Sequence, residues 1–338
     1  MNIGVVGCGA ISGIYIENLS RSKAVHIRAT ADLDPARARL AAERCSAQAM
    51  SVDALIDSPE IDLVLNLTTP NAHEQVARRA VEAGKHVYNE KPLCIEPKAA
   101  RSLLALAERK GVRVGCAPDT VLGAGVQTCR QLVADGQIGQ VVGGGAFMLC
   151  PGHESWHPNP AFYYKQGGGP ALDMGPYYVT ALVTILGPVT RVRSCATMTR
   201  RERTITSEPR RGERITVEVP THCVGLLEFG SGACVSVTLS FDVHRSRWGD
   251  IEIWGTQGSL AVPDPNTFAG PVRLFRAGAD DWEEMPLIDA PVHNARGLGV
   301  EDMALAIAEG KAHRASGTLA LHVLEVLDAL TRSGTVEL

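Results

Sequence analysis

The stretch NIGVVGCGAIS, residues 2–12, decides how the first part of this chain folds. Its apolar run from Asn2 to Gly7 predicts a short β-strand, and a helix is expected to begin near Ala10. Glycines between a strand and a helix let the main chain turn tightly and bring the N–H groups of the helix start close to a phosphate. The stretch therefore predicts a dinucleotide-binding turn, formed by Gly7, Gly9, Ala10 and Ile11.

Two further residues bear on this turn. Ser12 stands where the motif G-x-G-x-x-G has its third glycine, and it is small enough to let the helix pack closely on the strand. Asp32 ends the next predicted strand, where a carboxylate accepts hydrogen bonds from the adenosine ribose and repels a 2′-phosphate. We therefore expect NAD as the cofactor, while a nearby cation, Arg37, leaves NADP open. Alternatively, Asp32 and Asp34 only cap the helix that follows them.

Strands and helices alternate along residues 1–120. This alternation predicts an α/β domain with a doubly wound parallel sheet, the Rossmann fold. Strands are expected at 2–7, 25–31, 62–67, 86–88 and 112–115, and helices at 35–44, 72–83 and 97–110.

After about residue 140 the pattern changes to longer β-rich segments joined by glycine turns. Such segments are typical of antiparallel strands, so we expect residues 121–338 to form an α+β domain with an open, mainly antiparallel sheet. Strands are expected at 141–149, 189–199, 215–219, 222–229, 233–242 and 250–254, and helices at 171–186, 300–309 and 318–331.

Composition excludes several classes of protein. With 45% apolar residues and a net charge of −4, the 338 residues have the balance of a globular protein and not of a nucleic-acid binder. A basic run, Arg200–Arg203 with Arg210 and Arg211 nearby, is expected to be a solvated loop. The nine cysteines lack paired spacing, which indicates a reducing compartment. With neither a signal sequence nor a membrane-spanning apolar run, we expect a cytoplasmic protein that does not bind membranes.

Three more segments carry a family likeness: Thr68–His73 (TTPNAH), Ala83–Pro92 (AGKHVYNEKP) and Gly167–Tyr177 (GGGPALDMGPY). With the glycine turn, they resemble the Gfo/Idh/MocA family of oxidoreductases over nearly the whole chain. The resemblance implies a dinucleotide-binding domain at 1–120 and a substrate-binding and oligomerisation domain at 121–338, with terminal helices that pack back on the first domain. It also implies oxidation or reduction of sugars, polyols and related hydroxy compounds by a homodimer or homotetramer.

The same resemblance implies roles for individual residues. Lys91 is expected close to the nicotinamide, and a second group is expected along the cofactor: Thr68, Thr69, Pro70, Asn71, His73 and Glu90.

Proton transfer is expected to involve Lys91, Asp173 and Tyr177. Asp173 and Tyr177 are spaced i and i+4, which on one helix gives a shared face. Much of the family has histidine at the second position, and an unperturbed tyrosine has a pKa of about 10. We expect Tyr177 to pass the proton in the place of that histidine. Lys91 is expected to hydrogen-bond the reacting oxygen and to lower the free-energy cost of the proton transfer. Asp173 is expected to position the substrate or Lys91.

The segment His153–His157, HESWH, fits the zinc motif H-E-x-x-H. Prolines at 151, 158 and 160 argue against the helix that this motif needs, so no metal site is expected. A loop over the substrate is expected instead, with aromatic and polar side chains suited to a sugar ring. Besides Lys91, Asp173 and Tyr177, the expected substrate-binding residues are Asp119, His153, Trp156, His157 and Tyr163.

Two other functions stay open at this point. The fold also suits a nicotinamide-binding sensor without turnover, which the presence of Lys91, Asp173 and Tyr177 disfavours. It also suits a redox-neutral lyase or glycosidase that returns the hydride to its substrate.

Overall fold

The computed structural model describes residues 1–338, which form two compact units. The first unit contains Met1–Leu122 and His293–Leu321, and the second contains Gly123–Val292 and His322–Leu338. The chain therefore enters each unit twice.

A six-stranded parallel sheet forms the first unit, in the order β3-β2-β1-β4-β5-β6. Strand β1 pairs with β2 on one side and β4 on the other, so the strand order reverses there, where doubly wound sheets bind their ligands. The expected Rossmann fold is confirmed. The strands are β1 (Asn2–Val6), β2 (His26–Ala31), β3 (Gln48–Met50), β4 (Leu63–Asn66), β5 (His86–Asn89) and β6 (Val114–Cys116).

Three helices of this unit begin at a proline, namely Pro35, Pro70 and Pro97. The first helical position suits proline because its missing N–H has no intrahelical partner there. The helix expected from residue 72 accordingly begins two residues earlier, at Pro70. The helices are α1 (Ser12–Leu19), α2 (Pro35–Cys45), α3 (Val52–Asp57), α4 (Pro70–Glu82), α5 (Pro97–Lys110) and α9 (Leu298–Ala308).

The second unit contains a nine-stranded sheet in the order β16-β15-β14-β13-β7-β12-β11-β8-β17. Only β7 and β12 run parallel, so the expected mainly antiparallel sheet is confirmed. The strands are β7 (Val141–Leu149), β8 (Val189–Thr197), β11 (His222–Phe229), β12 (Cys234–Ser240), β13 (Ile251–Gly255), β14 (Gly258–Val262), β15 (Arg273–Arg276), β16 (Glu283–Glu284) and β17 (Gly334–Glu337).

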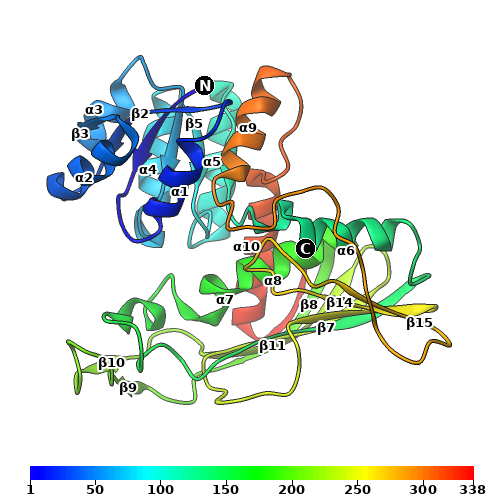
Figure 1. The fold of residues 1–338 in the computed structure, drawn as a ribbon. Helices are drawn as coiled ribbons and strands as arrows, with labels where there is room; N and C mark the ends of the chain where they lie inside the picture. Colours follow the sequence, from blue (N-terminus) through cyan, green and yellow to red (C-terminus); the bar gives the residue numbers. More distant parts are fainter. The chain divides into compact units, whose positions relative to one another are not determined.

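Helices cover one face of this sheet, and the other face carries none (Figure 1). Helices α6 (Ala124–Ala134) and α8 (Gly175–Leu186) contact β14 and β7. Strand β11 shows the resulting alternation, because Leu227 is fully buried while Val224 and Leu226 are 39% and 44% exposed. The open face therefore presents apolar side chains to solvent.

Two short strands, β9 (Glu202–Thr204) and β10 (Arg214–Thr216), form a separate sheet between β8 and β11 in the sequence. We call residues 198–217 the arm. The remaining elements are the 3-10 turns η1 (Thr120–Leu122) and η2 (Pro160–Tyr164) and the helices α7 (Gly169–Asp173) and α10 (Gly317–Arg332).

The single helix expected over residues 171–186 is wrong, because the structure divides it into α7 and α8. Pro176 has no N–H to donate to the carbonyl of Leu172, so one intrahelical bond is lost at the junction. The i and i+4 spacing of Asp173 and Tyr177 therefore does not place them on one continuous helix.

None of the helices combines the length and the apolar character that crossing a membrane requires.

Candidate active site

Gly7 and Gly9, which follow β1, meet different requirements. Gly7 has φ +94°, and a Cβ there would lie 2.6 Å from the carbonyl carbon of Leu67, so only glycine fits. A Cβ at Gly9 would meet no atom within 4 Å. A side chain at Gly7 would disturb the fold, whereas one at Gly9 would obstruct only a ligand.

The main chain at the start of α1 offers donors to an anion. The N–H groups of Gly9, Ala10 and Ile11 have no acceptor within the chain, and α1 has no side-chain cap. Ser12 Oγ donates to Gly9 O at 2.7 Å, which closes the turn at the place of the motif's third glycine. Free N–H groups and the positive end of a helix dipole suit a pyrophosphate.

Asp32 is hydrogen-bonded to this turn. Its Oδ2 accepts from Cys8 N at 2.7 Å, and its Oδ1 accepts from Asp34 N at 2.8 Å. Asp34, and not Asp32, caps α2 by accepting from Ala36 N at 2.9 Å. Arg37 lies 3.6 Å from Asp34 in an exposed ion pair. Because each carboxylate oxygen of Asp32 keeps acceptor capacity, turn and carboxylate together fit the phosphates and ribose of a dinucleotide.

His73 joins the loops after β4 and β5. Its buried ring has Nδ1 2.6 Å from Pro92 O and Nε2 3.0 Å from Thr68 O. Asn66 Nδ2 donates to Asn89 Oδ1 at 3.0 Å, which links the ends of the same two strands. The start of α4, with Thr69, Pro70 and Asn71, is thereby tied to the segment that contains Lys91.

Glu90 fixes the main chain at Lys91. Its Oε1 accepts from Tyr15 Oη at 2.9 Å, and its Oε2 accepts from Lys91 N at 2.8 Å. Glu90 is 8% exposed, whereas Lys91 is of intermediate exposure. An ammonium group held at a defined position can stabilise a developing negative charge.

Asp119 is almost completely buried. It is 1% exposed, and its Oδ2 accepts from Gly297 N at 2.8 Å and from Gly299 N at 3.0 Å, at the start of α9. Burial raises the pKa of Asp119 to about 6, although both hydrogen bonds act to lower it. In this structure the carboxylate of Asp119 binds the main chain at the start of α9.

The H-E-x-x-H segment forms a turn and not a helix, as the prolines indicate. His157 N donates to His153 O at 3.0 Å, and Asn159 N donates to His157 Nδ1 at 3.0 Å. No group of three His, Cys, Asp or Glu side chains in the chain is arranged to hold a metal ion. The motif's glutamate, Glu154, has other partners.

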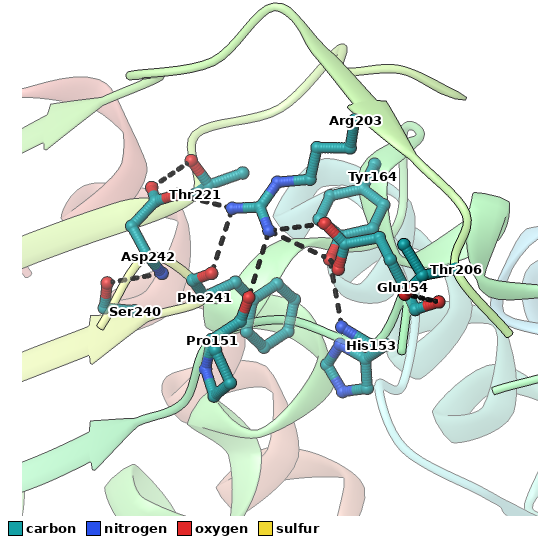
Figure 2. Close-up of polar contacts among 10 residues, drawn as sticks. All are labelled: Pro151, His153, Glu154, Tyr164, Arg203, Thr206, Thr221, Ser240, Phe241 and Asp242. Carbon is teal, nitrogen blue, oxygen red and sulfur yellow. Dashed lines mark hydrogen bonds and ion pairs between the residues drawn. The ribbon is translucent and has the colours of Figure 1, made fainter. Parts of the chain in front are cut away.

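Arg203, from the arm, is the centre of a buried ion cluster that Figure 2 shows. Its Nη1 donates to Glu154 Oε1 at 2.7 Å and to Pro151 O at 3.2 Å, and lies 3.4 Å from Tyr164 Oη. Its Nη2 donates to Phe241 O at 2.9 Å and to the carboxylate of Asp242.

The glutamate of this cluster stays ionised. Burial acts to raise the pKa of Glu154, but hydrogen bonds from Tyr164 and Arg203 outweigh it, so the pKa is lowered. The other carboxylate, that of Asp242, also accepts from Thr221 Oγ1 at 2.6 Å.

The expectation that the basic run is a solvated loop is wrong for Arg203, whose side chain is 1% exposed. The alternation in β9 offers a signal that sequence reasoning missed, since Glu202 and Thr204 are exposed and Arg203 points inward. Nothing in the sequence names Glu154 and Asp242 as its partners, because they lie 49 and 39 residues away.

The structure brings His153 and Asp173 together. His153 Nε2 lies 3.9 Å from Asp173 Oδ2, and the two side chains are 9% and 20% exposed. Burial lowers the pKa of His153, although the charge of Asp173 acts to raise it. The ring of Tyr163 stacks on His153 at 3.7 Å, while Trp156 is 61% exposed beside them.

Tyr177, the expected proton-transfer residue, lies in the first turn of α8 and is 7% exposed. Its neighbour Tyr178 donates to Asp250 Oδ1 at 2.8 Å. The hydroxyl of Tyr178 is thus already hydrogen-bonded to Asp250.

Comparison with known proteins extends this description. Residues 1–117 match the oxidoreductase family's NAD-binding Rossmann fold, and residues 126–261 match the GFO/IDH/MocA C-terminal domain. The inositol 2-dehydrogenase of Rhizobium meliloti is 24% identical over 98% of this chain and 96% of its own. An NAD-binding oxidoreductase from Klebsiella pneumoniae has a TM-score of 0.85 at 23% identity, covering 100% of this chain and 98% of that one. Levoglucosan dehydrogenase, in complex with NADH and L-sorbose, has a TM-score of 0.84 at 20% identity over 100% of this chain and 98% of that one. The chain belongs to the Gfo/Idh/MocA family and is an NAD(P)-dependent oxidoreductase.

Proposed function

We propose that this oxidoreductase transfers a hydride between NAD and a carbinol or carbonyl carbon of a sugar or polyol. The glycine turn carries the cofactor part of the proposal, because Asp32 is bonded to the turn that offers the free N–H groups. A carboxylate there suits the ribose of NAD and repels the 2′-phosphate of NADP. The similarity to proteins named inositol 2-dehydrogenase and levoglucosan dehydrogenase supports a sugar or polyol as the substrate.

The two domains divide this work in our proposal. Residues 1–120 bind the cofactor through Gly7, Gly9, Ala10, Ile11 and Asp32 and through the loops that His73 joins, which carry Thr68, Thr69, Pro70, Asn71 and Glu90. Residues 121–338 bind the substrate together with Lys91 and Asp119 of the first domain. Bound NAD supplies the carbon that accepts or returns the hydride.

In this proposal Lys91 and Tyr177 act on the reacting hydroxyl, and Asp173 positions the substrate. The Lys91 ammonium hydrogen-bonds the reacting oxygen and stabilises its negative charge. Tyr177, as a phenolate that the Lys91 ammonium stabilises, takes the proton and becomes the neutral phenol. A Tyr177→Phe variant with the kcat of the unmodified enzyme would exclude the role of that hydroxyl.

The remaining substrate contacts come from the loop at residues 151–165. His153, His157, Trp156 and Tyr163 combine ring nitrogens with aromatic surface, which suits the polar edge and apolar face of a sugar. Asp119 stays among the proposed substrate residues, although main-chain bonds to the start of α9 occupy one of its oxygens.

Nicotinamide absorbance tests the proposal directly. The enzyme is mixed with NAD or NADP and with myo-inositol, D-xylose, D-glucose or L-sorbose. Reduction of NAD by one of them is expected, and Lys91→Ala should lower kcat by about 10²–10³-fold because it removes one charge-stabilising donor. Lys98→Ala, an exposed lysine in α5, is the matched control and should change nothing.

Other outcomes point to the alternatives. Product formed without net cofactor reduction would replace the dehydrogenase with a redox-neutral lyase or glycosidase. Tight NAD binding without any turnover would leave a sensor.

We also propose that the open sheet face joins copies of this chain into a homodimer or homotetramer. Val224, Leu226 and Trp254 on that face are 39%, 44% and 41% exposed. Leu226→Glu should shift the mass measured by light scattering toward the monomer, while Leu305→Glu, on an exposed position of α9, should not. A monomer at every concentration of the unmodified protein would end this proposal.

A cytoplasmic location is the last part of the proposal. All nine cysteines are free, and Cys195 and Cys234 are exposed. Free exposed thiols suit a reducing compartment.

A further inference from the structure

The Arg203 cluster lies directly against the main chain of His153. Gly152, the preceding residue, has φ +98°. A Cβ there would lie 2.4 Å from Glu154 Oε2 and 2.5 Å from both Arg203 Nη1 and Tyr164 Oη. Glu154, Arg203 and Tyr164 thus fill the space that a side chain at Gly152 would need. Figure 2 shows these three side chains beside His153.

The position of the His153 ring depends on two neighbours that Arg203 also holds. His153 N donates to Tyr164 Oη at 3.1 Å, and Tyr164 in turn donates to Glu154. The ring of Phe241 meets the His153 ring edge-on at 4.5 Å, and Phe241 O accepts from Arg203 Nη2. One guanidinium therefore fixes the main chain of His153 and one wall of its ring.

The protonation of His153 follows from its burial. Nδ1 is buried without a hydrogen-bond partner, and a buried N–H without an acceptor is rare in native proteins. The hydrogen of the neutral ring is therefore placed on Nε2, which faces Asp173. At 3.9 Å the two atoms are too far apart for a direct bond, but close enough for one oxygen atom to be within hydrogen-bond distance of both. A hydroxyl is the group that accepts from Nε2–H and donates to a carboxylate.

Stability does not account for the cluster. Burying three charged side chains removes their hydration, and buried ion pairs replaced by apolar side chains of similar volume often leave stability unchanged. Arg203 Nε is itself buried without a partner, which adds to the cost. The cluster instead holds the segments around Arg203 in a single arrangement, because the guanidinium donates to acceptors in fixed directions.

We propose that Arg203 is a positioning residue, which holds His153 so that His153 Nε2–H and Asp173 bind the same hydroxyl of the substrate. The hydroxyl donates to Asp173 Oδ2 and accepts from His153. Arg203 itself touches no substrate. This inference rests on the proposed function, because it assumes a substrate with hydroxyl groups.

An uncharged version of the cluster separates positioning from folding. Arg203→Met, Glu154→Gln and Asp242→Asn are combined, so that no unpaired charge stays buried. The triple variant should fold with a melting temperature close to that of the unmodified enzyme and bind NAD unchanged. For the sugar or polyol that the enzyme turns over, KM should rise at least about tenfold, with kcat lowered less than about threefold, since a contact made equally in the ground state and the transition state is lost.

Two further variants complete the design. Arg203→Lys keeps the positive charge but loses the planar set of donors of the guanidinium. Its KM should therefore lie between those of the unmodified enzyme and the triple variant. Arg211→Met with Glu208→Gln removes an ion pair of the same arm that is 62% and 71% exposed, and should leave KM unchanged. A triple variant with unchanged KM would show that Arg203 is only structural and would overturn the inference.

A second readout needs no substrate. Long-range proton–nitrogen NMR on the full chain with NAD should show His153, assigned by His153→Gln, as the neutral Nε2–H form at pH 7. In the triple variant, its signals should shift and amide exchange in residues 151–165 should rise at least about tenfold. If neither changes, the positioning of His153 by Arg203 fails even though the proposed function stands. If both change but no hydroxyl substrate is turned over, the positioning of His153 stands, and the proposed function fails together with the shared substrate hydroxyl.

Discussion

The cofactor-binding turn and the loop at residues 151–165 are built from different material. The turn has free main-chain N–H groups and one carboxylate, Asp32, bonded to it, and it lies where the strand order reverses. In the loop, side-chain charges from three separate segments meet at Arg203. We therefore expect the first construction to tolerate most substitutions that keep glycine, and the second to depend on every partner.

Removing Arg203 alone tests that dependence with the largest expected effect. Arg203→Met leaves the carboxylates of Glu154 and Asp242, each 13% exposed, without their cation. Breaking a buried pair in this way costs about 3–5 kcal/mol, and the triple variant should recover most of it. Urea unfolding followed by tryptophan fluorescence measures both. A loss below about 1 kcal/mol would show that the loop is as tolerant as the turn.

Asp119 is the contrasting case of a buried carboxylate that bonds main chain. Its pKa is raised from 3.8 to about 6, so the folded state binds the proton more tightly than the unfolded state. The stabilisation is therefore complete below pH 3.8 and is lost as the pH rises through about 6. The stability of the unmodified protein relative to Asp119→Asn should fall by about 3 kcal/mol over this window. Urea titrations at several pH values give the difference, and a flat or rising one would contradict the assignment.

The two glycines of the turn sharpen the comparison within one region. Gly7→Ala should cost about 1–3 kcal/mol, since a side chain at φ +94° is strained and meets Leu67. Gly9→Ala should change stability by less than about 0.5 kcal/mol but raise the Kd for NAD at least tenfold. Thermal melts and calorimetric titration separate these effects. Equal losses of stability would mean that Gly9 is also a folding residue.

Asp32→Asn should have the smallest effect. The amide keeps an acceptor for Cys8 N but loses the charge and the second acceptor, which Asp34 N uses, so NAD affinity should fall about tenfold, or about 1.4 kcal/mol. NADP affinity should fall less, because the repulsion of its 2′-phosphate disappears. Binding titrations with both cofactors give the ratio, and an unchanged ratio would remove Asp32 from cofactor selection.

The contrast between the turn, built from local sequence, and the Arg203 cluster, built from distant residues, explains which features could be predicted from the sequence. Local patterns predicted the strands and helices of the first sheet within a few residues, and the glycine turn with Asp32 followed from spacing alone. Short elements such as β3 and α3 were missed because three and six residues carry little periodicity. The division at Met174 was missed because helical periodicity continues past Pro176. The Arg203 cluster was out of reach, since its partners become neighbours only after β9 and β12 have folded.

The return of residues 293–321 to the first unit has a consequence for synthesis on the ribosome. Asp119 finds its donors only in Gly297 and Gly299, and Cys116 N donates to Ala315 O at 3.1 Å. During synthesis the whole of Gly123–Val292 is made before either of these donors to Asp119 exists. The second unit also lacks β17 until the end. No fragment that stops before residue 293 contains either unit complete, so the chain matures as one piece.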